Sequence, residues 1–187
     1  MNRPTPTTAT RDSGTGDDPG WFRHVLGHYP TGVTVVTAIA PDNTPVGMVI
    51  GSFTSVSLDP PLIAFLPGRS STTWPLIRAG GAFCVNVLTA AQEALCRDFS
   101  AKAPGLFARH AWRGAASGSP ILAGVLAWLD CEIADVRSTG DHHLVLGRVR
   151  ELGTEKDTAE PLIFFRGRLS PLPRRRDSTG YEWPDWL

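Results

Sequence analysis

Short apolar runs separated by turn residues dominate the chain, and their length and composition predict β-strands. Residues 31–40 are rich in β-branched side chains, and a second apolar run over 46–53 follows a turn at 41–45. These two runs predict a hairpin. Residues 62–67 form a brief apolar run flanked by prolines, as expected of a buried strand. Four further strands are predicted over residues 82–88, 125–137, 143–152 and 161–169. A turn at 138–141 joins the strand at 125–137 to the strand at 143–152.

Polar residues at helix ends predict three short helices between these strands. The acidic pair before Pro19 can cap a first helix, because apolar residues follow at helical spacing. Residues 70–81 begin with serines and threonines and end on two glycines, which predicts a second helix. Thr89 and Gln92 form a capping box for a third helix that ends near Ser100. Residues 101–124, which follow it, are interpreted as a loop-rich section.

The predicted elements are six or seven strands with short helices, without the regular strand–helix alternation that builds a parallel sheet. We therefore expect a mostly β fold with short α-helices, an antiparallel β-barrel. A chain of 187 residues with 42% hydrophobic residues suffices for one domain. That domain is expected over residues 19–172. Residues 1–18 read as a disordered lead, and residues 173–187 form an aromatic tail expected to pack on the body or on a partner.

Charge and cysteine content narrow the function classes. Lys plus Arg and Asp plus Glu number 18 each, so no overall field favours nucleic acid or an anionic membrane surface. The three cysteines lack CxxC spacing and are interpreted as reduced thiols of the core. Because the sequence shows neither a long apolar span nor a signal peptide, we expect a soluble cytoplasmic protein.

The usual signatures of nucleotide, metal and nucleophile sites are missing from the sequence. It contains no GxGxxG after a strand, no GxxxxGK[ST], no HExxH and no GxSxG. The five histidines and three cysteines do not combine at ligand spacing, so no metal site is predicted. Any anionic ligand must then be held by a local arrangement.

Hydroxyl side chains crowd the stretch 52–57, where strict alternation predicts that Ser55 and Ser57 share one face with Phe53. Ser52 and Thr54 would share the other face with Val56, so neither face is cleanly apolar or polar. These hydroxyls can donate to phosphate oxygens, or they can simply satisfy the backbone of a loop.

Two further segments are candidates for ligand contact. Arg69 precedes a serine- and threonine-rich helix start, whose free N–H groups favour an anion, although such residues are also plain helix caps. His142 follows the Gly140-Asp141 turn, from which an imidazole can reach a ligand, although a surface histidine pair is the simpler interpretation.

Taken in order, these segments resemble the flavin reductase family over about residues 21–170. The matching stretches are FRHVLGHYPTGVTVVT, GSFTSVSLDPPL, RSSTTWPLI, FCVNVL, QEALCRDF, SPILAGVLAWLDCEI, GDHHLVLGRV and PLIFFRGRL. The resemblance implies an antiparallel split β-barrel of Greek-key type, a homodimer, and reduction of free FAD or FMN by NADH or NADPH. The reduced flavin then passes to a separate monooxygenase. The pattern is most similar to actinomycete reductases of two-component FAD-dependent monooxygenases, some of them in antibiotic biosynthesis.

The resemblance also implies the flavin-binding residues. It places the flavin along Val49, Ile50, Gly51, Ser52, Ser55, Val56 and Ser57, the last three near the phosphate. Arg69, Ser71 and Thr72 would complete the anion site, while Thr31 and Asn86 lie on strands beside the flavin. Many relatives read Thr-Ala-Asn-Ser-Phe at residues 49–53. This chain lacks that threonine and asparagine, so backbone groups around Gly51 are expected to bind the ring edge instead.

For the nicotinamide nucleotide, the resemblance implies contact with His142 and a wall formed by Phe165, Arg166 and Gly167. Catalysis would then be mostly juxtaposition of the two cofactors, with His142 positioning the nucleotide and flavin serving as a substrate. Three alternatives stay open: a non-catalytic flavin-binding or sensor module, a self-contained oxidase, and a barrel dimer without ligand.

Overall fold

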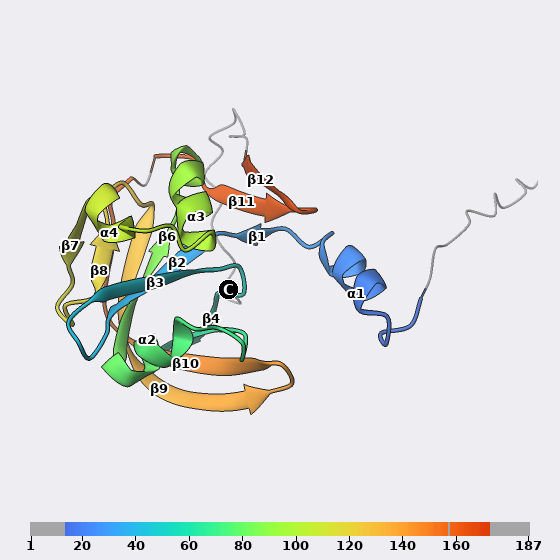
Figure 1. Ribbon diagram of the computed structural model, residues 1–187, viewed down its shortest axis with the longest axis horizontal. Helices are drawn as coiled ribbons and strands as arrows, with labels where there is room; N and C mark the ends of the chain where they lie inside the picture. The colour runs from blue at the N-terminus through green and yellow to red at the C-terminus, as the bar shows by residue number, and fades with distance from the viewer. Residues whose placement is uncertain (1–13, 157, 173–187) are drawn as a thin grey trace, which may run out of the picture.

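A computed structural model of the protein describes residues 14–156 and 158–172. Its main sheet contains β2 (Thr34–Ile39), β3 (Pro45–Ile50), β4 (Thr54–Leu58), β5 (Pro61–Phe65), β6 (Ala82–Val87), β9 (Ala127–Thr139) and β10 (His142–Thr154). These strands are hydrogen-bonded in the order β3-β2-β6-β9-β10-β5-β4, and each neighbouring pair is antiparallel. The sheet is strongly curved rather than flat (Figure 1).

Two small antiparallel sheets and four short helices complete the part of the chain that the structure describes. One sheet joins β1 (Thr31–Gly32), β11 (Leu162–Phe165) and β12 (Arg168–Pro171), and the other joins β7 (Trp112–Gly114) and β8 (Pro120–Leu122). The helices are α1 (Pro19–Leu26), α2 (Trp74–Gly80), α3 (Glu93–Ser100), which follows a 3₁₀ turn at Ala90–Gln92, and α4 (Leu106–Arg109). The predicted mostly β, antiparallel fold is confirmed.

The core lies on both faces of β2, because successive side chains of a strand point to opposite faces. Val36 packs with Phe83 in one apolar cluster, and α2 adds Trp74 to it. Val35 belongs to a second cluster, to which α3 contributes Phe99. The helices α2 and α3 therefore cover different faces of the sheet, as Figure 1 also shows.

Local sequence signals account well for several of these elements. Asp18 caps α1, its carboxylate accepting hydrogen bonds from the backbone N–H groups of Gly20 and Trp21. The predicted capping box of Thr89 and Gln92 is present before α3. The predicted hairpin is formed by β2 and β3. These three predictions are confirmed.

Other boundaries differ from the prediction. Residues 161–169 were expected to be one strand, but Arg166 (φ 48°) and Gly167 (φ 77°) turn the chain back between β11 and β12. Residues 31–40 divide into β1, which pairs with β11, and β2, which pairs with β3 and β6. The segment 101–124, expected to be a loop, contains α4, β7 and β8. Only the division of residues 31–40 arises from pairing with distant segments, because the β11–β12 turn and the β7–β8 pair each lie within a short stretch of the chain.

A β-bulge in β4 explains the irregular hydroxyl pattern of residues 52–57. Ser55 pairs with Ile63 and Ser57 pairs with Leu62, so Val56 is an extra residue in β4. Because Ile63 and Leu62 are consecutive residues of β5, Ser55 and Ser57 lie on opposite faces of the sheet. The prediction that these two serines share a face is wrong.

The helix α1 projects away from the sheet (Figure 1). None of its residues is buried, and Phe22 and Leu26 are 52% and 54% exposed. The described helices include none that is long and apolar enough to cross a bilayer. The predicted aromatic tail and the first thirteen residues of the predicted lead lie outside the described residues.

The three cysteines are free and buried, in agreement with the prediction of reduced core thiols. Burial raises the pKa of the Cys131 thiol to about 12 and raises the pKa of Cys84 further still. Both thiols are therefore protonated at neutral pH and are poor nucleophiles.

Candidate functional site

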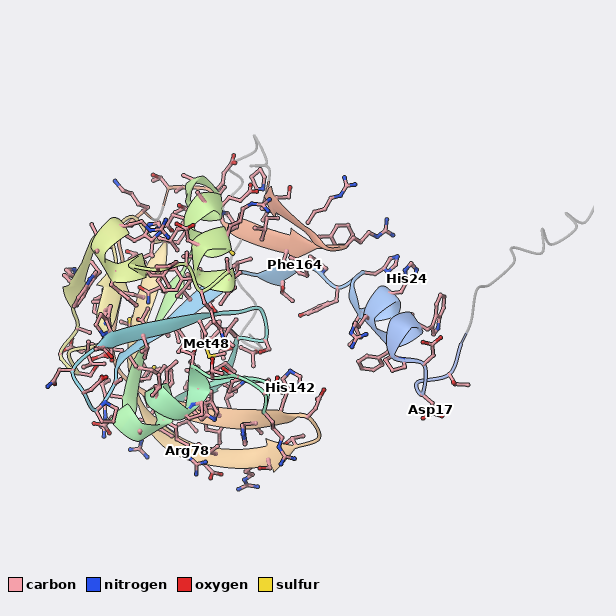
Figure 2. All side chains as sticks on the ribbon, in the orientation of Figure 1. Asp17, His24, Met48, Arg78, His142 and Phe164 are labelled. Carbon is pink, nitrogen blue, oxygen red and sulfur yellow. The ribbon has the colours of Figure 1, made fainter. Side chains whose placement is uncertain are left out.

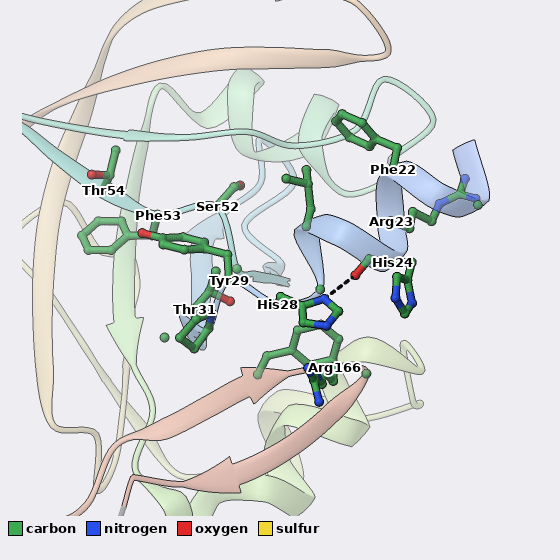
Figure 3. Close-up of a pocket in the computed structure, with 18 residues that line it drawn as sticks. Phe22, Arg23, His24, His28, Tyr29, Thr31, Ser52, Phe53, Thr54 and Arg166 are labelled. Carbon is green, nitrogen blue, oxygen red and sulfur yellow. Dashed lines mark hydrogen bonds between the residues drawn. The ribbon is translucent and has the colours of Figure 1, made fainter. Parts of the chain in front are cut away.

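An open cleft of about 1280 Å³ lies where α1, the segment 51–54 and the β11–β12 turn meet (Figure 3). Its volume exceeds the roughly 300–1,000 Å³ that is usual for drug-sized ligands, so a nucleotide cofactor can enter. The cleft is lined by Gly20, Phe22, Arg23, His24, Leu26, Gly27, His28, Tyr29, Pro30, Thr31, Gly32, Gly51, Ser52, Phe53, Thr54, Phe164, Arg166 and Gly167.

The charge of this lining is one-sided. Arg23 and Arg166 contribute positive charge, and His24 and His28 contribute imidazoles, whereas no aspartate or glutamate is among the described lining residues. His28 donates its Nδ1 hydrogen to the backbone oxygen of His24 at 2.8 Å, which leaves its Nε2 unused by that bond. In a chain without net charge, this cleft favours an anionic ligand.

The walls of the cleft are held together by backbone contacts between distant segments. The Arg166 N–H donates to the Gly27 oxygen at 3.0 Å, which ties the β11–β12 turn to the end of α1. Thr31 pairs with Phe164 across β1 and β11. A side-chain carbon at Gly51 would lie 3.2 Å from Thr31 Oγ1, so Gly51 keeps the floor of the cleft open.

A second chain of contacts leads from the cleft to the β9–β10 turn. The Ser52 hydroxyl accepts from the Leu66 N–H at 3.0 Å. Just beyond Leu66, the Arg69 N–H donates to the Asp141 oxygen at 2.8 Å, and Gly68 forms an isolated bridge with His142. The segment 66–69 and the turn before β10 are therefore one connected unit, which joins two regions that the sequence singled out separately.

His142 begins β10 and forms a pair with Asp141. Its Nδ1 lies 2.6 Å from Asp141 Oδ1, and its side chain is 45% exposed. The hydrogen bond with His142 holds the pKa of the Asp141 carboxyl below its usual value. Figure 2 shows His142 on the same side of the molecule as His24 of α1 and Phe164 of β11.

The flavin reductase like domain family matches residues 26–173 of the chain. The chain belongs to this family. A flavin reductase of Pseudomonas putida is 53% identical over 150 residues, which are 80% of this chain and 88% of that protein. The reductase subunit of a flavin-dependent monooxygenase of Mycobacterium tuberculosis is 42% identical over 171 residues, which are 91% and 90% of the two chains.

A solved structure supports the same family assignment. The NADH:FAD oxidoreductase of Streptomyces globisporus, in complex with NAD and FAD fragments, has a TM-score of 0.83 and 34% identity, over 89% of this chain and 100% of that chain. The protein is thus an oxidoreductase of the flavin reductase family, as the sequence predicted.

Five of the predicted site residues of this reductase line the cleft: Thr31, Gly51, Ser52, Arg166 and Gly167. Arg69 and His142 are not in its lining, but they belong to the unit that Ser52 connects to it. The structure thus brings these seven predicted residues into one neighbourhood.

The predicted phosphate residues Ser55, Val56 and Ser57 do not line the cleft. Only Thr54, the first residue of β4, does so, and β4 then continues along the edge of the sheet. The bulge places Ser55 and Ser57 on opposite faces, so they cannot act as a pair of donors on one face.

Two hydroxyls of the predicted anion site accept hydrogen bonds from within the chain. The Ser71 oxygen accepts from the backbone N–H groups of Thr73 and Trp74 at the start of α2, as a helix cap does. The Thr72 hydroxyl accepts from Lys102 Nζ at 2.6 Å. The simpler alternative, plain capping, describes Ser71.

Asn86 is a structural residue of the reductase. It is fully buried, and its amide nitrogen donates within the sheet, with Thr37 Oγ1 at 3.0 Å and the Pro120 oxygen at 3.2 Å. Its Oδ1 accepts from the Leu122 N–H at 2.8 Å. Asn86 therefore fastens β8 to β2 and β6 and does not reach the cleft.

Three more predicted residues differ in part from expectation. The side chains of Val49 and Ile50 pack with the two apolar clusters, and the Ile50 oxygen accepts from the Thr34 hydroxyl at 2.9 Å. Phe165 does not line the cleft, although the Arg166 guanidinium lies 5.2 Å from the centre of its ring. Its neighbour Phe164 lines the cleft instead, because successive residues of β11 face opposite ways.

Sequence reasoning missed the contribution of α1. Arg23, His24, His28 and Tyr29 all line the cleft, yet their segment was read only as a short amphipathic helix. One arginine and two histidines within residues 23–28, in a helix too short to form a core and in the turn after it, were the available signal.

Proposed function

We propose that the reductase transfers a hydride from NADH or NADPH to free flavin, with FAD preferred over FMN, and supplies the reduced flavin to a separate flavin-dependent monooxygenase. The observation that carries this proposal is the basic cleft, whose described lining includes two arginines and no carboxylate. Both substrates are phosphate-bearing anions, and the chain has no net charge to attract them in any other way.

The residues of the cleft fit a flavin nucleotide. Gly51 allows close approach of a planar ring, and the Thr31, Ser52 and Thr54 hydroxyls lie beside it. We propose that Arg166, which the resemblance assigned to the nicotinamide nucleotide, binds the flavin phosphates from the opposite wall of the cleft. We propose that backbone groups of residues 49–52 bind the ring edge, in place of the side chains that many relatives carry there.

The nicotinamide nucleotide is assigned to the neighbouring unit. His142 and Arg69 belong to the unit that the Ser52 hydroxyl joins to the cleft. Backbone hydrogen bonds between the segment 66–69 and the β9–β10 turn fix the positions of both residues. When both cofactors are bound, they supply the chemistry, a hydride that passes from nicotinamide C4 to flavin N5. The chain's own residues bind and orient the two substrates, which is the source of the rate enhancement.

An open cleft suits a flavin that leaves after reduction. The relative from Mycobacterium tuberculosis is named as a reductase subunit of a flavin-dependent monooxygenase, and the solved relative is named an NADH:FAD oxidoreductase. These names support a monooxygenase partner, FAD and NADH for this chain. Secondary-metabolite biosynthesis is the setting that the sequence resemblance favours, and the cytoplasm is the proposed compartment.

We also propose a homodimer. An eight-residue helix is not stable alone in water, yet α1 buries none of its residues in its own chain. The edge strand β4 offers a second apolar surface, with Val56 49% and Leu58 89% exposed. Light scattering should give the mass of two chains, and Leu26→Ser should shift it toward one. A wild-type mass of one chain would contradict the homodimer.

Steady-state oxidation of NADH and NADPH by the purified protein, with FAD, FMN and riboflavin added in turn, tests the proposed function. We expect stimulation by FAD above that by FMN, with release of reduced flavin. A protein that binds flavin but stimulates no oxidation would be a non-catalytic binding module. Retained flavin that only a further small substrate bleaches would indicate a self-contained oxidase. Either result would overturn the proposal.

A further inference from the structure

The pair formed by Asp141 and His142 fixes which imidazole nitrogen is free. Asp141 Oδ1 lies 2.6 Å from His142 Nδ1, and the bond holds the pKa of the Asp141 carboxyl below its usual value. The carboxylate is therefore ionised at neutral pH and can only accept a hydrogen. Nδ1 must then carry the hydrogen, and Nε2 is the end of the ring left for other contacts.

The free nitrogen and the Ser70 hydroxyl lie on the same side of Gly68, where there is room for one further carbon. A side-chain carbon at Gly68 would lie 3.9 Å from His142 Nε2 and 3.9 Å from Ser70 Oγ. The glycine leaves this position empty, so an imidazole nitrogen and a hydroxyl border the same space. Gly68 lies outside the segments that the sequence singled out, and Ser70 belongs to the serine- and threonine-rich helix start without an assigned contact.

The loop and the turn that carry these groups are held in register by their backbones. The Arg69 N–H donates to the Asp141 oxygen at 2.8 Å, and the His143 N–H donates to the Pro67 oxygen at 2.9 Å. These bonds fix the backbone on both sides of the space. The orientation of the His142 ring about its own side-chain bonds then depends on Asp141.

We propose that Asp141 is a positioning residue, which holds the His142 imidazole so that Nε2 and the Ser70 hydroxyl contact the nicotinamide nucleotide above Gly68. This inference rests on the proposed function, because it takes the nucleotide to bind beside His142. Asp141 itself is not assigned any contact with the substrate.

A purely structural role for Asp141 would make a different prediction. Its side chain is 94% exposed, and exposed ion pairs contribute little to folding stability. Removal of the carboxylate should therefore leave the fold and its unfolding temperature unchanged. Asp135 is a matched control on the same hairpin, since it accepts from Arg137 at 2.8 Å and also has a lowered pKa.

Nitrogen NMR of the ligand-free protein tests the geometry without any activity measurement. At alkaline pH, where the imidazole is neutral, the wild type should show His142 with a protonated Nδ1 and an unprotonated Nε2. Asp141→Ala should give a mixture of the two tautomers, and Asp135→Ala should give the wild-type spectrum. A wild-type ring protonated on Nε2 would overturn the proposal.

A double-mutant cycle tests the connection with the nucleotide, with fluorescence titration of NADH as the readout. Asp141→Ala should weaken NADH binding about fivefold, within the usual range of coupling between contacting residues. In the His142→Ala background the same change should have no further effect. Equal losses in both backgrounds would overturn the proposal, because Asp141 would then act independently of His142.

Two further variants sharpen this cycle. Asp141→Asn keeps an oxygen that can accept from Nδ1 and should restore most of the affinity. Gly68→Ala adds a methyl group with ordinary 3.9 Å contacts, so the fold should accept it while the NADH affinity falls.

In steady state, Asp141→Ala should raise KM for NADH and leave kcat and KM for flavin unchanged. A fall in kcat alone would contradict a positioning role.

Failure of this inference and failure of the proposed function are distinguishable. A wild-type protein that neither binds NADH nor oxidises it would refute the proposed function. An active wild-type protein whose double-mutant cycle shows no coupling would refute the role of Asp141 alone.

Discussion

Polar side chains gather in two regions of this molecule, around Asn86 inside the sheet and around the cleft beside α1. Asn86 is fully buried, and its amide nitrogen and oxygen both bond to groups of the same chain. Thr37, also fully buried, lies against the Cys84 and Pro120 oxygens. Buried polar groups need such partners, because an unsatisfied one destabilises the fold.

The cleft shows the opposite arrangement. Arg23 and Arg166 line it without any carboxylate among the lining residues that the structure describes. Polar side chains fully bonded within the chain indicate structure, whereas basic side chains gathered around an opening whose described lining holds no carboxylate indicate a ligand.

Asn86→Ala should produce the largest change in stability. The substitution leaves the Leu122 N–H without its acceptor and the Pro120 oxygen without one donor in a buried region. Since each unsatisfied buried group costs about 1–3 kcal/mol, we expect the free energy of unfolding to fall by about 3 kcal/mol or more. Denaturant titration measures this free energy. Thr31→Val, in the cleft, should change the free energy of unfolding by less than about 0.5 kcal/mol. Comparable losses in the two variants would contradict the distinction between the two regions.

Gly51→Ala should produce the largest change in flavin binding. The added methyl group would lie 3.2 Å from Thr31 Oγ1, on the floor of the cleft. Because the added methyl group occupies space that the flavin ring would approach, we expect the Kd for FAD to rise about tenfold, a loss of about 1.4 kcal/mol of binding free energy. Fluorescence titration measures the Kd, with Gly114→Ala in β7 as the control outside the cleft. A Kd for FAD that stays at the wild-type value would remove Gly51 from the flavin site.

Arg166→Gly should affect stability and binding in opposite directions. Arg166 has a φ of 48°, which glycine adopts without the penalty of about 1 kcal/mol that other residues carry. The free energy of unfolding should therefore rise slightly, while loss of the guanidinium raises the Kd for FAD about fivefold. Thermal unfolding and FAD titration of the same sample measure both effects. Parallel changes in stability and affinity would assign Arg166 a structural role.

Local sequence signals predicted the parts of the fold that depend on local chemistry. The Asp18 cap, the capping box of Thr89 and Gln92, and the hairpin around residues 41–45 are all set by residues close together in the chain. Two-residue turns are equally local, yet the one at Arg166 and Gly167 was missed because the flanking apolar residues read as one continuous strand.

Features that depend on distant partners were not predictable from one sequence. The extra residue in β4 exists only in the register with β5, so strict alternation misplaced Ser55 and Ser57. The resemblance implied Asn86 beside the flavin, but its acceptor Pro120 and donor Leu122 belong to a segment interpreted as loop-rich, so its bonding within the fold had no local signal. The role of α1 in the cleft likewise depends on how the chain folds back toward the β11–β12 turn.

Amide NMR of the protein titrated with FAD tests most directly whether the cleft, and not the polar interior, is the flavin site. Backbone amides report from both regions in one spectrum. The signals of Gly32, Gly51 and Gly167, which line the cleft, should shift on addition of FAD. Those of Thr37, Asn86 and Leu122, in the polar interior, should stay in place. Shifts at these three interior residues with unmoved cleft signals would contradict the account.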